Sequence, residues 1–164
     1  QADINSGYRR FDDKKFFAMV LHFCRDSGIP KTKLNKLLWY SDFLSFKHNT
    51  VSISGTKYAH LPFGPCPNNY DVFIAYLTDI DKSLTVVEQS SGIYSWEVLV
   101  SAGAPDYSLF TNNEMHILSS VAKFFESKTA SETSQRSHLE QGYQKTCDSQ
   151  IISYEFADGL VGVE

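Results

Sequence analysis

Three side chains in this 164-residue sequence are of types that carry out nucleophilic chemistry: Cys66, His60 and His138. Cys66 and His60 lie close together in a proline-rich segment, and His138 follows Ser137 near the start of a predicted helix. A cysteine nucleophile also needs a base and an oxyanion hole, and no local signature of a cysteine enzyme surrounds Cys66. A lone histidine more often fixes a loop through one hydrogen bond. We therefore expect no enzyme, and keep a small hydrolase using Cys66 or His60 with His138 as an alternative.

Metal and phosphate sites have little support in the sequence. The cysteines are Cys24, Cys66 and Cys147, an odd number without close metal-type spacing. His22 and Cys24 are two positions apart on a predicted helix, where their side chains diverge. Neither GxGxxG nor GxxxxGK[ST] occurs, so no loop of free amides cradles a phosphate. We predict no cofactor, no metal and reduced thiols in a cytoplasmic protein.

The overall charge argues against a polyanionic partner. Lys and Arg number 15 against 19 Asp and Glu, which gives a net charge of -4. Binding to nucleic acid needs clustered basic residues, and the densest basic segment, 31–36, has only three lysines. No apolar run approaches the roughly 18 residues of a membrane span. Aromatic residues make up 14% of the chain, which favours a core built on large rings or a protein interface.

The elements that position these residues are organised around segment 33–67. Its first half predicts an amphipathic helix from about Thr32 to His48 or Asn49, apolar over most of its circumference and therefore central. Residues 51–61 show partial alternation of β-branched and aromatic residues, which predicts one strand or two short ones. The following segment, 61–69, carries three prolines and is expected to form no regular structure.

Other patterns predict further helices and one hairpin. Helices are expected from Asp12 to a stop at Gly28, from 69 to 82, and after the capping boxes that begin at Thr111 and Thr129. Segment 84–100 is a hairpin candidate with its turn at 90–92. Its residues expected to share one face are Val86, Tyr94, Trp96 and Val98. The pattern of 151–156 fits either a strand or a helical turn.

Together these elements predict an α+β fold, namely a predominantly helical single domain with a small antiparallel sheet. Residues 1–10 are polar and aperiodic and are expected to be a tail or linker. The domain is expected to span 11–158, with a loose tail at 159–164. Because the chain begins with Gln1 rather than Met, we expect a piece of a longer protein with an upstream module.

Four segments, in this order, resemble the Panacea domain of SocA-like antitoxins. They are KLNKLLWYSDFLSF at 33–46, GTKYAHLPFGPCP at 55–67, Ser137-His138 followed by Tyr143, and ISYEFA at 152–157. Three positions depart from the usual pattern: Trp39 stands beside the usual tyrosine, Ser41 replaces a frequent alanine, and Tyr143 stands where tryptophan is common. The resemblance covers most of 12–158.

The resemblance implies a binding protein of prokaryotic or phage toxin–antitoxin systems. Its partner would be a cognate protein toxin, which it would sequester or deliver to a ClpXP-type protease. An alternative is a regulator whose separate DNA-binding module is missing from this chain. The motif residues carried over are Lys33, Lys36, Trp39, Tyr40, Asp42, Tyr58, His60, Pro62, Gly64, Pro65, Ser137 and His138. These residues either contact the partner or serve as scaffold, in which case the hairpin is the candidate for partner specificity. The oligomeric state stays open.

Overall fold

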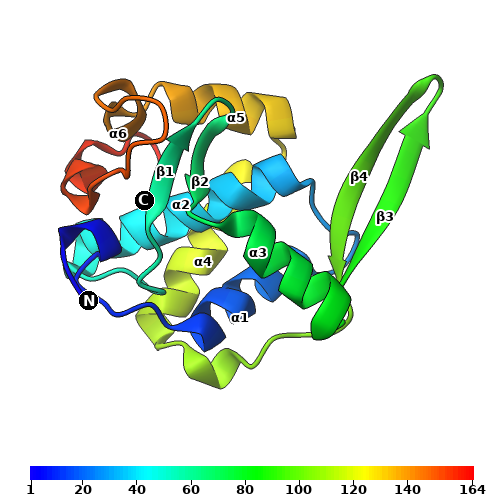
Figure 1. The fold of residues 1–164 in the computed structure, drawn as a ribbon, viewed down its shortest axis with the longest axis horizontal. Helices are drawn as coiled ribbons and strands as arrows, with labels where there is room; N and C mark the ends of the chain where they lie inside the picture. Colours follow the sequence, from blue (N-terminus) through cyan, green and yellow to red (C-terminus); the bar gives the residue numbers. More distant parts are fainter.

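Helix α2 (Lys31–Asn49) runs through the middle of the molecule, and the other elements pack around it (Figure 1). The computed structural model describes residues 1–164. Every residue of α2 from Leu34 to Ser45 is buried, including five polar ones. A helix that is apolar over most of its circumference is expected to have neighbours on several sides. The central position and the end of α2 near His48 and Asn49 are therefore confirmed.

The remaining elements complete the α+β domain that the sequence predicts. The helices are α1 (Asp13–Phe23), α3 (Tyr70–Ala75), α4 (Asn112–Phe125), α5 (Ala130–His138) and α6 (Gln141–Gln144). A π-helical turn (Tyr76–Ile80) extends α3, and 3-10 helices span Ile4–Ser6, Tyr107–Leu109 and Tyr154–Gly159. The strands are β1 (Tyr58–Leu61), β2 (Gly64–Pro67), β3 (Leu84–Ser91) and β4 (Tyr94–Ser101). They form two separate antiparallel hairpins rather than one sheet. No helix combines the length and the hydropathy that a membrane crossing requires.

Local capping signals set the starts of α1, α4 and α5 where the sequence predicts them. The Asp12 carboxylate accepts a hydrogen bond from the Lys15 amide (3.0 Å) and caps α1. Both capping boxes are present, at the starts of α4 and α5. In the first, the Thr111 hydroxyl accepts from the Glu114 amide (3.1 Å) and the Glu114 carboxylate accepts from the Thr111 amide (2.9 Å). Each box satisfies backbone donors that a helix start leaves free.

The proline-rich segment differs from the sequence prediction, because Gly64–Pro67 forms strand β2. Its register pairs Pro67 with Tyr58 and Pro65 with His60. The backbones of Tyr58 and His60 bond instead to residues 149–152 on the opposite side of β1. Both prolines therefore lie opposite residues of β1 whose backbone groups point away from β2. The amide hydrogen that proline lacks is not needed there, so the strand can accommodate both prolines. The strand expected from 51 begins only at Tyr58.

The hairpin predicted for 84–100 is confirmed, but the faces of its first strand are exchanged. Gly92 and Ile93 form a two-residue loop, shorter than the predicted turn at 90–92. With the longer turn Val86 would have faced Trp96; in the structure it pairs with Leu99 and lies on the face opposite Trp96. The outer part of this hairpin projects from the helical body (Figure 1).

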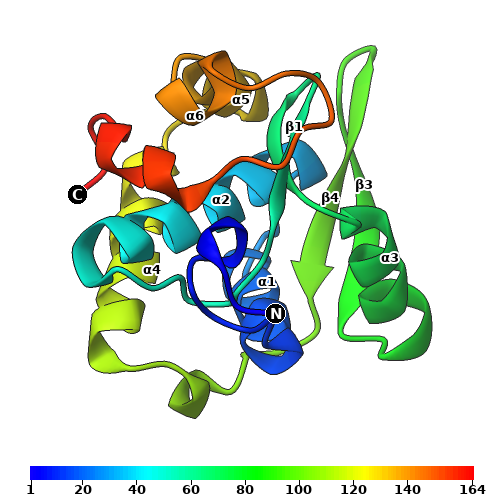
Figure 2. The same ribbon diagram turned by 60° about the vertical axis from the view of Figure 1, so that its left-hand side comes forward.

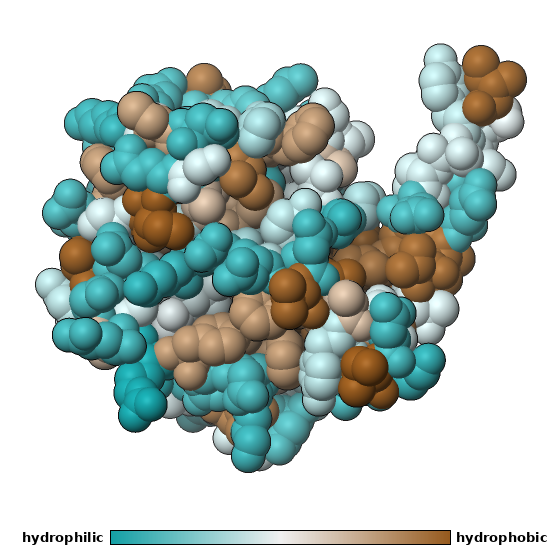
Figure 3. Space-filling model, in the orientation of Figure 1, coloured by the Kyte–Doolittle hydropathy of each residue, from teal (hydrophilic) through white to brown (hydrophobic).

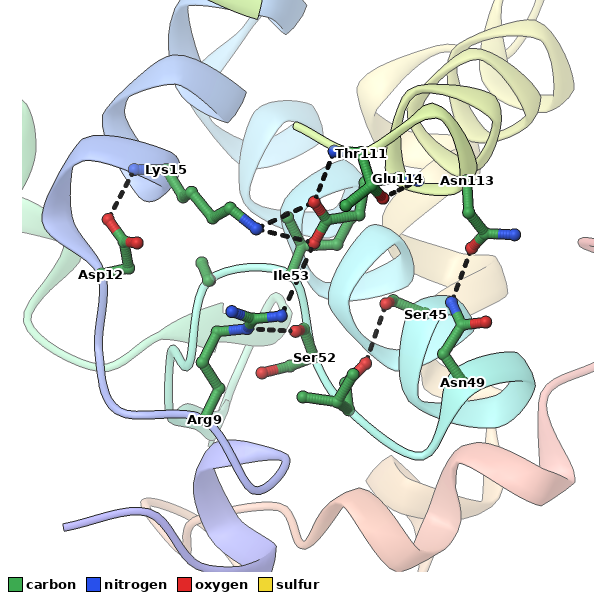
Figure 4. Close-up of polar contacts among 12 residues, drawn as sticks. Arg9, Asp12, Lys15, Ser45, Asn49, Ser52, Ile53, Thr111, Asn113 and Glu114 are labelled. Carbon is green, nitrogen blue, oxygen red and sulfur yellow. Dashed lines mark hydrogen bonds and ion pairs between the residues drawn. The ribbon is translucent and has the colours of Figure 1, made fainter. Parts of the chain in front are cut away.

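The first ten residues, expected to be a tail or linker, pack onto the domain. The Ser52 amide bonds to the Gly7 carbonyl (2.9 Å), and Arg9 Nε donates to the Ser52 carbonyl (2.8 Å). Nearby, Lys15 of α1 and Glu114 of α4 form an ion pair with a Nζ–Oε1 distance of 2.8 Å (Figure 4). These contacts hold the start of the chain, α1 and α4 around the loop after α2.

The end of the chain is also packed, so the loose tail expected at 159–164 is wrong. Leu160 and Val163 are buried and belong to the hydrophobic core. Before them, Ile151 forms a single bridge with Ala59, and the chain then enters the 3-10 helix Tyr154–Gly159. This combination explains why 151–156 fits both a strand and a helical turn. Figure 2 shows the segment, in orange and red, passing beside β1 and α2.

Candidate partner-binding surface

Most of the motif residues meet in the interior, where α2 and α5 enclose the β1–β2 hairpin. Gly64, at the hairpin turn, has φ +113°, a conformation that L side chains rarely adopt. A Cβ on Gly64 would overlap the Lys36 side chain of α2 and the Ser137 hydroxyl of α5. Ser137 in turn donates to the Ser134 carbonyl (2.6 Å). Glycine is required because two helices close onto the turn.

Asp42 organises the other end of this interior cluster. Its fully buried carboxylate accepts four hydrogen bonds. The donors are the amides of Ile53 and Ser54 (2.8 and 2.9 Å), the Ser54 hydroxyl (2.6 Å) and the Tyr58 hydroxyl (2.7 Å). Burial raises the pKa of Asp42, and these hydrogen bonds oppose that rise. Asp42 therefore shapes the loop between α2 and β1, which is why 51–57 is not a strand.

Three aromatic rings stack against the outside of the β1–β2 turn. The rings of His60 and Tyr143 are 3.7 Å apart at 10°, and those of Tyr143 and His138 are 4.5 Å apart at 9°. The Tyr143 hydroxyl donates to the Leu61 carbonyl (2.7 Å), and His60 Nδ1 bonds the Thr146 hydroxyl (2.8 Å). Burial, followed by the nearby Lys36 and His60, lowers the pKa of His138. The stack fixes the turn and accounts for Tyr143 in the motif.

The groups that the hydrolase hypothesis needs have different partners. Cys66 Sγ accepts a hydrogen bond from Lys36 Nζ (3.4 Å), whereas His60 bonds Thr146. The strand register pairs Cys66 with Ala59 and places its side chain on the face opposite that of His60. A nucleophile and its base must lie within hydrogen-bond reach. This arrangement therefore gives no support to a Cys66–His60 pair.

The other motif residues also hold the scaffold. The Tyr40 hydroxyl donates to Glu140 (3.2 Å), and its ring lies 4.8 Å from that of Phe125. Lys33 Nζ donates to the Lys128 carbonyl (2.6 Å). Burial raises the pKa of both Tyr40 and Glu140. The motif residues that are buried are Lys36, Trp39, Tyr40, Asp42, Tyr58, Gly64, Pro65 and Ser137, and of the full set only Pro62 is well exposed.

The outer part of the β3–β4 hairpin has the opposite character. Ile93 and Tyr94 at its tip are 93% and 72% exposed, and Trp96 is 42% exposed. Hydrophobic residues are visible at the tip and at the base of the hairpin (Figure 3). A groove of about 430 Å³ separates Trp96 from the start of α5, with Lys33 and Lys128 along its walls. The exposed rings of the hairpin and the groove beside Trp96 make the hairpin the candidate surface for a partner.

Sequence reasoning missed one feature of the hairpin. Glu88 lies directly opposite Glu97 on the solvent-exposed strands. Like charges directly opposite each other destabilise a strand pair. The signal that would have found this pair is Gly92 as the first residue of a two-residue loop, which fixes the register.

A family model described as antitoxin SocA-like, Panacea domain, matches residues 34–143. That range contains α2 from Leu34, both hairpins, α4, α5 and Tyr143, and therefore every motif residue except Lys33. No curated protein and no solved structure matches the chain.

Proposed function

The chain belongs to the Panacea family of SocA-like antitoxins, and we propose that it neutralises a protein toxin by binding it directly with the β3–β4 hairpin. Binding alone would do this, without a catalytic step, in the cytoplasm. The observation that carries the proposal is the contrast between buried motif residues and a projecting hairpin with exposed aromatic side chains. A protein that acts by binding needs such a surface.

The hairpin has the properties of a binding element. Tyr94 and Trp96 are of the residue types that dominate interface hot spots, since they bury a large area at low entropic cost. Beyond the bridge between Leu99 and Ile29 at its base, this two-stranded ribbon has two free edges that can accept a strand from a partner. Isolated hairpins are only marginally stable in water, so a partner that covers this one would also order it. The groove beside Trp96 supplies a place for an apolar side chain of the toxin.

The charges of the hairpin indicate what the toxin presents. Glu88 and Glu97 repel each other across the strands, and no basic residue lies between Leu84 and Ser101. A lysine or arginine of the toxin placed against this pair would relieve the repulsion. Electrostatic complementarity of this kind selects partners and speeds association. Because Glu88 and Glu97 lie on the face of the hairpin opposite Trp96, we propose a toxin that contacts both faces, with an apolar anchor in the groove beside Trp96 and basic side chains against the glutamate pair.

Co-expression with the protein encoded by the adjacent reading frame tests the proposal. We expect the two proteins to purify together and the chain to restore growth that the toxin arrests. Reversal of both charges by Glu88→Lys with Glu97→Lys should weaken capture at least tenfold, which corresponds to about 1.4 kcal/mol. Glu126→Lys, an exposed site at the end of α4, is the matched control and should leave capture unchanged.

The outcomes separate the two parts of the proposal. If the unaltered chain captures no such protein, toxin binding is wrong. If capture survives the double reversal, the toxin binds but the hairpin is not its contact. The route of neutralisation is read from cells that lack a ClpXP-type protease. Sequestration predicts that protection persists there, whereas delivery to the protease predicts that it is lost and that toxin accumulates.

A further inference from the structure

Lys36 and Cys66 form an isolated amine–thiol pair in the interior. Lys36 is fully buried and Cys66 is 5% exposed. The Nζ and Sγ atoms are 3.4 Å apart, and no ion pair of the structure includes Lys36. A buried ammonium without a carboxylate partner is costly. The structure thus holds a primary amine against a thiol with no charged group to neutralise it.

A cavity beside this pair gives access to a small oxidant. It has a volume of about 210 Å³ and is lined by Lys36, Cys66, Leu61 and Phe63, among others. A water molecule needs only about 10–15 Å³ of such volume, and hydrogen peroxide is only slightly larger. Phe63 is 70% exposed at the turn, so the cavity lies next to the surface. Peroxide can therefore reach Cys66 without unfolding of the domain.

We propose that Cys66 and Lys36 are a peroxide-dependent modification site, at which oxidation of the thiol leads to a reversible sulfur–nitrogen bond between β2 and α2. In the first step the Cys66 sulfur attacks one peroxide oxygen. The O–O bond breaks, and the products are a sulfenic acid at Cys66 and one water. In the second step Lys36 Nζ attacks the Cys66 sulfur. The S–O bond breaks, the hydroxyl leaves with a proton from the amine as a second water, and a sulfenamide remains.

The surroundings favour the second step. Burial lowers the pKa of Lys36, which raises the fraction of neutral amine, the form that acts as a nucleophile. The 3.4 Å separation is within the range of a near-attack geometry. The bond needs no second oxidant, and a thiol reductant reverses it. It closes a loop across 30 residues, so the oxidised protein should unfold at a higher temperature.

The chain contains its own controls. Cys147 is exposed and Cys24 is buried. Burial raises the pKa of Cys24 to about 12, which disfavours its reactive thiolate. The full chain is treated with hydrogen peroxide, trapped with dimedone, digested, and analysed by mass spectrometry. Dimedone should label Cys147 as a sulfenic acid and should not label Cys24.

The expected result for Cys66 is a crosslinked peptide pair. Its mass should equal the sum of the Lys36 and Cys66 peptides less two hydrogens, and a thiol reductant should abolish it. Lys36→Met should replace the crosslink by a dimedone adduct at Cys66, and Cys66→Ser should remove both products.

If peroxide oxidises Cys147 while Cys66 in the unaltered chain stays free, or carries dimedone or a sulfinic acid, the proposal is overturned. The unaltered chain alone decides this, whether or not Lys36→Met folds. The outcome is independent of toxin binding.

Discussion

The two hairpins of this domain are the same supersecondary element in opposite surroundings. All four residues of β2 are buried, and β1 is bonded on its far edge to residues 149–152. By contrast, the strands β3 and β4 are mostly exposed beyond their bases and have free outer edges. The first hairpin is held by α2, α5 and the stacked rings. The second is held to the body only at its base, where Leu99 bridges Ile29, and its outer part is held by its own strand pairing. The comparison teaches that the recognisable motif maintains the scaffold, while the less distinctive hairpin is left available to a partner.

The largest expected effect is on the buried side of this comparison. Asp42→Ala removes an acceptor of four hydrogen bonds and takes the acceptor from the buried Tyr58 hydroxyl and the buried amides of Ile53 and Ser54. We expect the free energy of unfolding to fall by about 3–5 kcal/mol in urea denaturation. Asp158→Ala, at an exposed position, is the control and should cost less than about 0.5 kcal/mol. If Asp42→Ala lowered the free energy of unfolding by less than about 1 kcal/mol, the contrast between a structurally essential buried hairpin and an exposed one would be wrong.

A glycine pair compares the two turns directly. Gly64 and Gly92 both have positive φ, but a Cβ on Gly92 meets nothing within 4 Å. Gly92→Ala should therefore cost only the backbone strain, about 1 kcal/mol. Gly64→Ala adds a collision with Lys36 and Ser137 and should cost roughly 2–4 kcal/mol. Thermal unfolding of both variants gives the comparison, and equal costs would show that α2 and α5 do not clamp the first turn.

The interior should also respond to acid through His22. Burial, with a smaller contribution from Arg25, lowers the pKa of His22 to about 4. Because this value is below the unfolded value of about 6.5, the folded state favours the neutral ring. The stabilisation is complete above pH ~6.5 and is lost as the pH falls towards 4. Urea unfolding across this range should show a loss on the order of 2 kcal/mol that His22→Gln lacks. Parallel curves for the two proteins would contradict the assignment.

The smallest effect on stability is expected at the exposed hairpin. Tyr94→Ser combined with Trp96→Ser removes two exposed side chains of β4, of which Trp96 donates a hydrogen bond to Gln89 of the neighbouring β3. We expect the free energy of unfolding to change by less than about 0.5 kcal/mol, so that the midpoint of thermal unfolding stays nearly unchanged. Toxin capture, by contrast, should be lost. A variant that unfolds readily would show that these rings support the fold. A stable variant that still captures the toxin would place the contact elsewhere.

The sequence predicted those parts of the fold that depend on local signals. The capping boxes at Thr111 and Thr129 and the apolar circumference of α2 are readable from neighbouring residues. Strand β2 was missed because proline is compatible with a strand only when the partner needs no donor, which depends on residues 149–152 far along the chain. The packing of both chain ends likewise depends on contacts that no local pattern reports.

The candidate site was likewise predicted only in part from the sequence. The motif residues were identified from the sequence, but their burial was not, since polar residues such as Lys36 and Asp42 normally lie at the surface. Their partners come from other segments: Cys66 for Lys36, and Tyr58 for Asp42. The exposed hairpin was predicted as an element, and its opposed Glu88 and Glu97 appeared only once the register was known.

Hydrogen exchange of the chain with and without bound toxin tests the central claim most directly. The free protein should exchange rapidly over the outer part of β3–β4 and slowly over β1–β2 and α2, because exposed backbone pairs open most easily. With toxin bound, we predict that exchange slows across residues 85–98 and stays unchanged at residues 58–67. Slower exchange confined to residues 58–67 and α5, with the β3–β4 hairpin unaffected, would contradict the account.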